Sequence, residues 1–215
     1  MHHTTSEPTP ATKGITIHWA HQYDLAVRLL TLGKDRTLRQ KTLNLAHVQP
    51  GETVLDVGCG TGDLTLLVKS ATGPDGTVHG IDAAPEMVAV ARQKAAQSGL
   101  AVDFQVGLIE KLAFPDSTFD LVLSSLMMHH LPEETKRQGL VEILRVLKPG
   151  GRLLVIDFKR PTSRMERLVQ PLFFHHGMLI GVQDLPPLME TAGFEGVETG
   201  DVGFLMLGFV RAYKS

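Results

Sequence analysis

The chain has few of the features that mark secreted, membrane-spanning or nucleic-acid-binding proteins. Among its 215 residues there is one cysteine, Cys59, so no disulfide can form within the chain. No apolar run reaches the roughly 20 residues that a membrane-spanning helix needs. The 21 basic residues are balanced by 23 acidic ones, so no overall positive field attracts nucleic acid or anionic lipid. These absences predict a cytoplasmic globular protein with no nucleic-acid partner and no stable insertion into a membrane.

The residues that are present fit one compact domain. A length of 215 residues and a hydrophobic fraction of 43% suffice for a sizeable core. Residues 1–14 are polar and rich in proline and threonine, without the apolar stretch of a signal peptide, and predict a flexible tail. Residues 15–215 then form the folded domain, in which we find no internal repeat.

Short apolar runs alternate with amphipathic segments along this domain. Strands are predicted at 53–57, 77–81, 102–106, 119–124, 151–158, 197–199 and 204–213. Helices are predicted at 17–30, 36–47, 64–70, 85–98, 133–147 and 185–192. This order predicts a single doubly wound α/β domain of Rossmann-like type. Its seven-stranded sheet is mostly parallel, is covered on both faces and ends in an antiparallel strand.

The first predicted strand runs into a glycine-rich turn, VLDVGCGTGD at 54–63. Such a turn lets the backbone approach a ligand closely, at the sheet edge where the strand order reverses. The spacing Gly58-x-Gly60-x-Gly62 differs from the G-x-G-x-x-G of dinucleotide sites, and Asp56 would repel a pyrophosphate. An ammonium group would be attracted to that carboxylate. The turn therefore favours S-adenosylmethionine, which carries an amino-acid end and no phosphate.

A second acid supports this interpretation. Asp82 ends the second predicted strand, about 20 residues after Gly62. An acid at that place can accept hydrogen bonds from both hydroxyls of a ribose. The alternative is that the glycines only turn the chain and that both acids lie on the surface.

Several stretches then resemble one known family. They are YDL at 23–25, the segment 32–43, LDVGCGTGDLT at 55–65, FPDSTFD at 114–120, RVLKPGGRL at 145–153 and AGF at 192–194. On these stretches, which extend over nearly the whole chain, the sequence resembles the class I methyltransferases. Within them it is most similar to the ubiquinone/menaquinone C-methyltransferase family and its small-molecule relatives. The resemblance implies an enzyme that binds S-adenosylmethionine, transfers its methyl group and releases S-adenosylhomocysteine.

The resemblance also implies a role for each matching position. The glycine turn would hold the methionine part of the cofactor, with Asp56 beside its amino group and Ser125 beneath it. Asp82 would hold the ribose, and the adenine would lie between 83–87 and 108–110. The implied cofactor site consists of Tyr23, Asp56, Gly58, Gly60, Thr61, Gly62, Asp82, Ala83, Met87, Leu108, Ile109, Glu110 and Ser125.

Two regions outside this site are expected to cover it. The N-terminal helices, within 15–48, would form a lid that places Tyr23 close to the sulfonium, because the face of an aromatic ring attracts a desolvated cation. The region 160–190 replaces part of the substrate cap that relatives build after the fifth strand. Its apolar part could be core, a lid over a hydrophobic acceptor or the contact of a homodimer.

The chain departs from its relatives at two places. Leu108 stands where relatives usually have Asp or Asn, so a side-chain acceptor for the adenine amino group is missing, although a backbone carbonyl could replace it. His129 and His130 stand where the quinone enzymes have an Arg-Asn pair, which argues against a quinone-type substrate.

The same two histidines follow the fourth predicted strand, at the edge of the sheet where ligands bind. A histidine can accept the proton of a phenol or an enolisable carbon. Neighbours on an extended segment point in opposite directions, so we expect one ring to face the pocket and favour His130 as the base. The alternative is that both rings only shape the pocket and cap the helix that begins near Pro132. The catalytic candidates are thus His130, His129 and Tyr23.

Other histidines do not indicate a metal. His18 and His21 lie near Tyr23, and 175–176 is a second pair, but no cysteine or carboxylate completes a recognisable ligand spacing. The leading function is methyl transfer by in-line displacement to oxygen or carbon of a small, fairly apolar acceptor, aromatic or quinol-like. The alternatives are a non-catalytic regulatory domain that binds the cofactor and, third, a nicotinamide-dependent oxidoreductase.

Overall fold

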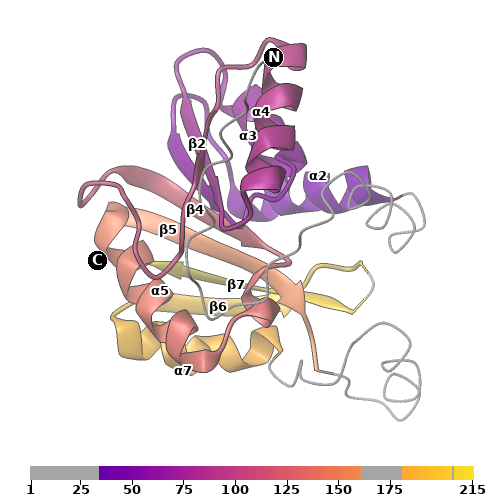
Figure 1. Cartoon of the computed structure of the whole chain (residues 1–215). Coiled ribbons are helices and arrows are strands. Elements are labelled where there is room, and N and C mark those ends of the chain that lie inside the picture. Colours follow the sequence, from indigo (N-terminus) through magenta and orange to yellow (C-terminus); the bar gives the residue numbers. More distant parts are fainter. Residues whose placement is uncertain (1–33, 161–180, 205) are drawn as a thin grey trace.

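The structure, a computed structural model, describes residues 34–160, 181–204 and 206–215 (Figure 1). The predicted tail at 1–14, the predicted helix at 17–30 and most of the predicted cap at 160–190 lie outside the described residues. The described helices are α2 (Asp35–Ala46), α3 (Asp63–Thr72), α4 (Pro85–Ser98), α5 (Glu133–Val146) and α7 (Leu185–Ala192). Two short 3₁₀ helices, η1 (Met128–His130) and η3 (Val182–Asp184), accompany them. None of these helices is long and apolar enough to cross a bilayer.

Seven strands form one sheet. They are β1 (Thr53–Val57), β2 (Thr77–Asp82), β3 (Asp103–Val106), β4 (Phe119–Ser125), β5 (Leu147–Phe158), β6 (Glu195–Asp201) and β7 (Leu207–Tyr213), in the spatial order β3-β2-β1-β4-β5-β7-β6. β1 pairs in parallel with both β2 and β4, so the strand order reverses between β1 and β4. β7 runs antiparallel to both of its neighbours. The predicted doubly wound fold with an antiparallel C-terminal strand is confirmed.

Helices cover both faces of this sheet, which is why its central strands are apolar at nearly every position. One face packs against α5 and α7, with Val155, Ile143 and Met189 in the same buried cluster. The opposite face packs against α2 and α3, where Leu38 and Val68 meet alternate residues of β1, β4 and β5. Figure 1 shows the two groups of helices on either side of the strands. The glycine-rich turn after β1 is thus held on a sheet that is buried on both sides.

One predicted boundary is wrong. The sequence predicts a helix through Leu147 followed by a turn at 148–151, whereas α5 ends at Val146 and β5 already begins at Leu147. Leu147 pairs with Phe119, and a register shift follows before the regular pairing resumes. Gly150 has a φ of +76°, and residues 148–151 stand opposite Asp120 alone, so the predicted turn persists as a bulge within β5. Backbone bonds of 2.8 and 2.9 Å between Lys214 and the two glycines at 150 and 151 hold this bulge in the sheet.

Candidate functional site

The glycine-rich turn lies at the carboxyl end of β1, next to β2. The backbone N–H groups of Gly58 and Cys59 both donate to the carbonyl of Ile81, at 2.8 and 2.9 Å. Gly58 has a φ of +76°, and a Cβ at this position would lie 2.3 Å from Cγ of Met127. A side chain is therefore excluded by both the backbone conformation and the space. This close approach brings the turn against the chain that leaves β4.

Asp82 is fixed to the same turn. Its Oδ2 accepts the N–H of Gly60 at 2.9 Å, and its Oδ1 accepts the N–H of Ala84 at 2.9 Å. Burial raises the pKa of this carboxyl, and the two amides oppose that rise. The residue stays partly exposed, so its remaining lone pairs are accessible to a ligand. This geometry suits an acceptor for ribose hydroxyls, and that role stays a prediction.

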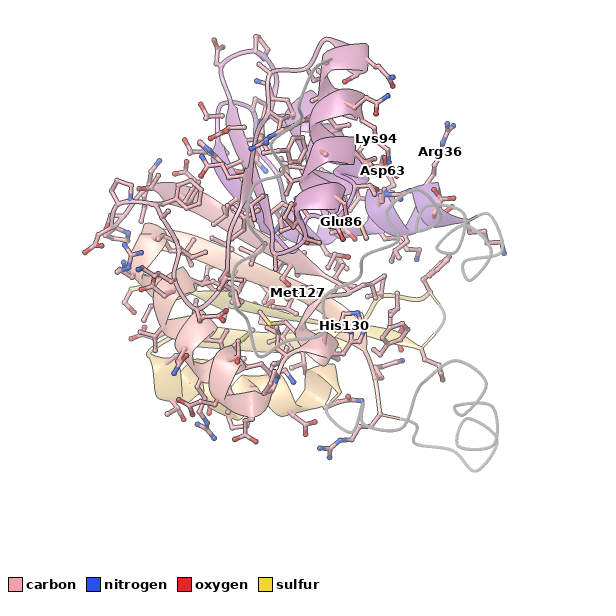
Figure 2. The ribbon with its side chains drawn as sticks, viewed as in Figure 1. Arg36, Asp63, Glu86, Lys94, Met127 and His130 are labelled. Carbon is pink, nitrogen blue, oxygen red and sulfur yellow. The ribbon has the colours of Figure 1, made fainter. Side chains whose placement is uncertain are left out.

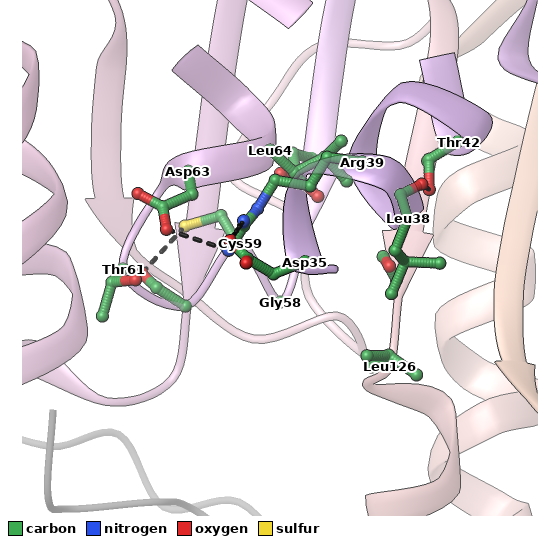
Figure 3. A pocket seen from close by; sticks show the side chains of 13 residues that line it. Asp35, Leu38, Arg39, Thr42, Gly58, Cys59, Thr61, Asp63, Leu64 and Leu126 are labelled. Atoms are coloured by element: carbon green, nitrogen blue, oxygen red, sulfur yellow. Dashed lines mark hydrogen bonds and ion pairs between the residues drawn. The ribbon is translucent and has the colours of Figure 1, made fainter. Parts of the chain in front are cut away.

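A pocket opens beside the turn (Figure 3). It contains about 590 Å³ of empty space, which includes part of the open solvent at its mouth. Its wall comes from α2, the end of β1, the glycine turn, the start of α3 and the end of β4. The residues that line it are Asp35, Leu38, Arg39, Thr42, Asp56, Gly58, Cys59, Gly60, Thr61, Asp63, Leu64, Ser125 and Leu126. Five residues predicted for the methionine part of the cofactor are therefore brought together here: Asp56, Gly58, Gly60, Thr61 and Ser125.

Asp56 is the acid at the bottom of this pocket. The residue is 2% exposed, and in the described part of the chain the side-chain donor that bonds its carboxylate is Thr65 Oγ1, at 2.6 Å. Burial raises the pKa of Asp56 to about 7, against the opposing hydrogen bond from Thr65. A buried carboxylate with so few donors lacks a compensating charge. The ammonium group of an amino acid would provide it, so the residues present fit the methionine end of S-adenosylmethionine.

The outer wall of the pocket is charged. Arg39 on α2 pairs with Asp35 and, at 2.9 Å, with Asp63 at the start of α3. Lys94 on α4 donates to the other oxygen of Asp63 at 2.7 Å and to Thr61 Oγ1 at 3.0 Å. Figure 3 shows Arg39 reaching from α2 across to Asp63. Arg39 thus attaches α2, and Lys94 attaches α4, to the glycine-rich turn and the start of α3.

The sequence interpretation missed this contribution of α2. Leu38, Arg39 and Thr42 all line the pocket from one side of the helix. A signal was present, because the stretch 32–43 was among those that match the methyltransferases. It did not indicate which side chains of the helix face the ligand, since that depends on how α2 docks on the sheet.

The residues predicted for the adenine lie outside the wall of this pocket. Met87 and Ile109 are 2% and 5% exposed, and Ile109 packs into the core beneath α5. Leu108 forms an isolated backbone bridge with Lys111 just after β3. The adenine assignments of Ala83, Met87 and the segment 108–110 stay predictions, and a contribution from Ile109 would come from its backbone. Tyr23, His18, His21 and the pair at 175–176 lie outside the described residues.

The expectation of an extended segment at His129 and His130 is wrong. Both residues belong to the 3₁₀ helix η1, and their rings lie side by side with centroids 3.9 Å apart. The turn is closed by the N–H of His130, which donates to the carbonyl of Met127 at 3.0 Å. Figure 2 shows His130 and Met127 together at the carboxyl end of the strands. The two rings thus lie next to each other and do not point in opposite directions.

A carboxylate that the sequence interpretation did not single out holds the first of these rings. Asp157, near the end of β5, accepts Nδ1 of His129 at 2.7 Å and the backbone N–H of His129 at 3.0 Å. The signal in the sequence was an acid at the end of a strand that is otherwise apolar. Among the residues that the structure describes, no group of three or more His, Cys, Asp or Glu side chains is arranged to hold a metal ion.

Comparison with known proteins agrees with this site. Residues 54–151 match the family model for a methyltransferase domain. The ubiquinone/menaquinone biosynthesis C-methyltransferase of Geobacter sulfurreducens is 37% identical over 157 residues, which cover 72% of this chain and 60% of the relative. The chain therefore spans less than two thirds of that relative's length. The demethylmenaquinone methyltransferase of Thermus thermophilus is 39% identical over 155 residues, which cover 72% of this chain and 69% of the relative.

A solved structure gives the same result. The crystal structure of an S-adenosylmethionine-dependent methyltransferase from Aquifex aeolicus superposes with a TM-score of 0.73 at 26% sequence identity, over 89% of this chain and 98% of the other. The chain belongs to the class I S-adenosylmethionine-dependent methyltransferases, in the family of the ubiquinone/menaquinone C-methyltransferases.

Proposed function

We propose that this protein transfers the methyl group of S-adenosylmethionine to oxygen or carbon of a small, fairly apolar acceptor of phenolic or quinol type. The observation that carries the transfer is the pocket in which the glycine turn lies beside the buried carboxylate of Asp56. The quinol-like acceptor is supported by the names of the two relatives, which refer to ubiquinone and menaquinone biosynthesis and to demethylmenaquinone. The His129–His130 pair replaces the Arg-Asn pair of those enzymes and argues that the acceptor differs from theirs in detail.

The cofactor supplies an electrophilic methyl carbon on a sulfonium, so the protein mainly aligns the two reactants and excludes water. Asp56 would hold the ammonium group and Asp82 the ribose, which together fix the direction of the methyl group. The chain that leaves β4 places Met127 against Gly58 of the turn, and the two histidines follow in η1. This side is apolar and aromatic, with Phe158 edge-on to His129 at 5.0 Å between ring centroids. Such a surface favours an aromatic acceptor.

Three further expectations belong to this proposal. The acceptor is a small molecule and not nucleic acid, because the net charge of −2 offers no basic field. The site of action is the cytoplasm. A homodimer through the region 160–190 stays a prediction.

The test is to incubate the purified full chain with methyl-labelled S-adenosylmethionine and a panel of demethylated quinols, phenols, amines and thiols. We expect release of S-adenosylhomocysteine with the quinols or phenols, and the position of the label in the product names the methylated atom. Tight cofactor binding without release on any acceptor would favour the non-catalytic regulatory alternative. Hydride transfer to a nicotinamide in place of methyl transfer would favour the third alternative.

A further inference from the structure

His129 and Asp157 lie at the carboxyl edge of the sheet, on the chain that leaves β4 and on the neighbouring strand β5. β4 ends at Ser125, which lines the pocket together with Leu126, and η1 begins at Met128. Asp157 lies at the end of β5, the neighbouring parallel strand. An acceptor that approaches the methyl group has to arrive at this edge, because ligands of such sheets bind outside the carboxyl ends of the strands.

The hydrogen bonds around Asp157 determine where His129 carries its proton. The carboxylate is 2% exposed and accepts the N–H groups of His129 and Phe158, at 3.0 and 2.8 Å, besides Nδ1 of His129 at 2.7 Å. A carboxylate that already accepts two backbone N–H groups presents its oxygens to the ring as acceptors. Nδ1 therefore has to be the donor in the third bond. In the neutral ring this leaves Nε2 with a free lone pair.

A buried lysine of α5 lies beside this pair. Lys136 on α5 is 1% exposed, and burial lowers its pKa while the carboxylates of Asp157, Asp184 and Glu133 oppose that change. Lys136, His129, Asp157 and residues of η3 line one small hollow. A buried ammonium beside a buried carboxylate compensates its charge. In the described part of the chain, the titratable groups around His129 are Asp157, His130, Lys136, Asp184 and Glu133.

His130 has a different environment, although its ring lies against that of His129. Its Nδ1 is buried without a hydrogen-bond partner among the described residues. Burial lowers the pKa of His130 to about 4, and the neighbouring His129 adds to that decrease, while Asp157 opposes it. A group of that pKa is a weak proton acceptor near neutral pH. In the described residues Nδ1 of His130 has no carboxylate partner, so Asp157 acts on this ring only at a distance, whereas it is hydrogen-bonded to the ring of His129.

We propose that His129 is the general base of the methyl transfer, that Asp157 is its positioning residue, and that the acceptor therefore carries a hydroxyl proton. This inference rests on the proposed function, in which the acceptor is phenolic or quinol-like. The O–H bond of the acceptor breaks and its proton goes to Nε2 of His129. The oxygen's electron pair forms the bond to the methyl carbon, while the C–S bond breaks and its pair remains on sulfur. If the adjacent ring carbon attacks, His129 returns the first proton to the oxygen, and the proton of that ring carbon leaves to solvent as the ring regains its aromaticity.

Two acceptors that differ in ionisation test the base. The probes are 1,4-dihydroxynaphthalene, whose hydroxyls are neutral at pH 8, and thiophenol, which is already ionised there. We expect His129→Gln to lower turnover of the naphthalenediol by about 100-fold or more, and turnover of thiophenol only a few-fold. Asp157→Asn should show the same selective loss. His130→Gln tests the rival candidate for the base, and any loss that it causes should be equal on the two probes. An equal loss on both probes in His129→Gln, or a larger selective loss in His130→Gln, overturns the assignment.

A second measurement needs no acceptor and separates this inference from the proposed function. In the ¹⁵N spectrum of the histidine rings of the full chain, we expect His129 to be protonated at Nδ1, with a strongly downfield Nδ1 proton. That proton signal should disappear in Asp157→Asn and persist in His130→Gln. A His129 ring protonated at Nε2 alone overturns the inference, whether or not any acceptor is methylated. A correct ring tautomer without turnover on either probe would contradict the proposed acceptor class, and with it the assignment of His129 as a base.

Discussion

The carboxylate of Asp82 accepts the backbone N–H of Gly60 at 2.9 Å, across the gap between β2 and the turn after β1. The acid that is predicted to hold the ribose and the turn that is predicted to hold the methionine part are therefore one rigid unit. Its second oxygen accepts the N–H of Ala84, at the start of α4. A change at Asp82 is expected to affect both halves of the cofactor site.

Replacing Asp82 with alanine should weaken S-adenosylmethionine binding by about 1–3 kcal/mol, the cost of leaving charged hydrogen bonds unmade. Titration calorimetry of the purified full chain measures this. Asp75→Ala is the matched control, because Asp75 is exposed in the turn before β2 and should leave the affinity unchanged. Equal affinities in Asp82→Ala and the wild type would remove Asp82 from the cofactor site.

Cofactor affinity should rise with pH up to about pH 7 and then level off, because the ammonium group binds the ionised form of Asp56. Burial raises the pKa of that carboxyl to about 7 in the folded chain, so the charged form becomes the main one only above that pH. Calorimetric titration between pH 5.5 and 8.5 checks the slope. Asp56→Asn should bind more weakly at pH 8 and lose the rise. A wild-type affinity that does not change between pH 5.5 and 7 would contradict the contact with the ammonium group.

The same carboxyl predicts how the stability of the ligand-free protein depends on pH. Its folded pKa of about 7 lies above the ordinary value of 3.8, so between these values the folded chain binds more protons than the unfolded one. The contribution of Asp56 to the free energy of unfolding is therefore fully present at low pH and is lost as pH rises to about 7. Its full size is of the order of 4 kcal/mol. Urea denaturation of the wild type and Asp56→Asn at pH 5 and pH 8 measures the difference, which should favour the variant at pH 8.

Gly58→Ala should destabilise the protein more than a left-handed backbone alone explains. A φ of +76° costs an alanine about 1–2 kcal/mol, and contact with Met127 at 2.3 Å adds a further 1–3 kcal/mol. Gly99→Ala is the control, since Gly99 has a φ of +67° and nothing lies within 4 Å of its added Cβ. Urea denaturation compares the two, and Gly58→Ala with Met127→Ala should recover the part due to the contact. Similar losses in both single variants would show that Met127 gives way.

Arg39→Met should weaken the binding of S-adenosylmethionine by roughly tenfold, the effect of one charged hydrogen bond. Among the described residues that line the pocket, Arg39 is the one with a basic side chain, and the cofactor's carboxylate has to lie in this pocket if its ammonium group contacts Asp56. Binding of the decarboxylated cofactor should not change. Arg36→Met on the same helix is the control, because Arg36 is exposed and points away from the body of the domain (Figure 2). Equal losses with both cofactors would instead indicate that Arg39 only docks α2.

The sequence by itself determined the order of the elements and the identity of the cofactor turn. Strands buried on both faces are apolar at nearly every position, so β1, β2 and β4 were predicted to within a residue or two. The glycines of the turn, Asp56 and Asp82 could be recognised for a similar reason. A turn that needs glycine and an acid that ends a strand are both local properties of the chain. They can therefore be recognised from the spacing of residues in the sequence.

Only the tertiary structure decided which side chains lie close to that turn. The pairing of Lys214 with the glycines before Arg152 extended β5 through a predicted turn. The docking of α2 brought Arg39 to Asp63, which is 24 residues away along the chain, and the parallel pairing of β4 with β5 brought His129 to Asp157, 28 residues away. Local propensity contains no information about such contacts, because they depend on the register of strands and the rotation of a helix about its axis. The cofactor class could thus be predicted from the sequence, whereas the base and its carboxylate could be inferred only from the folded chain.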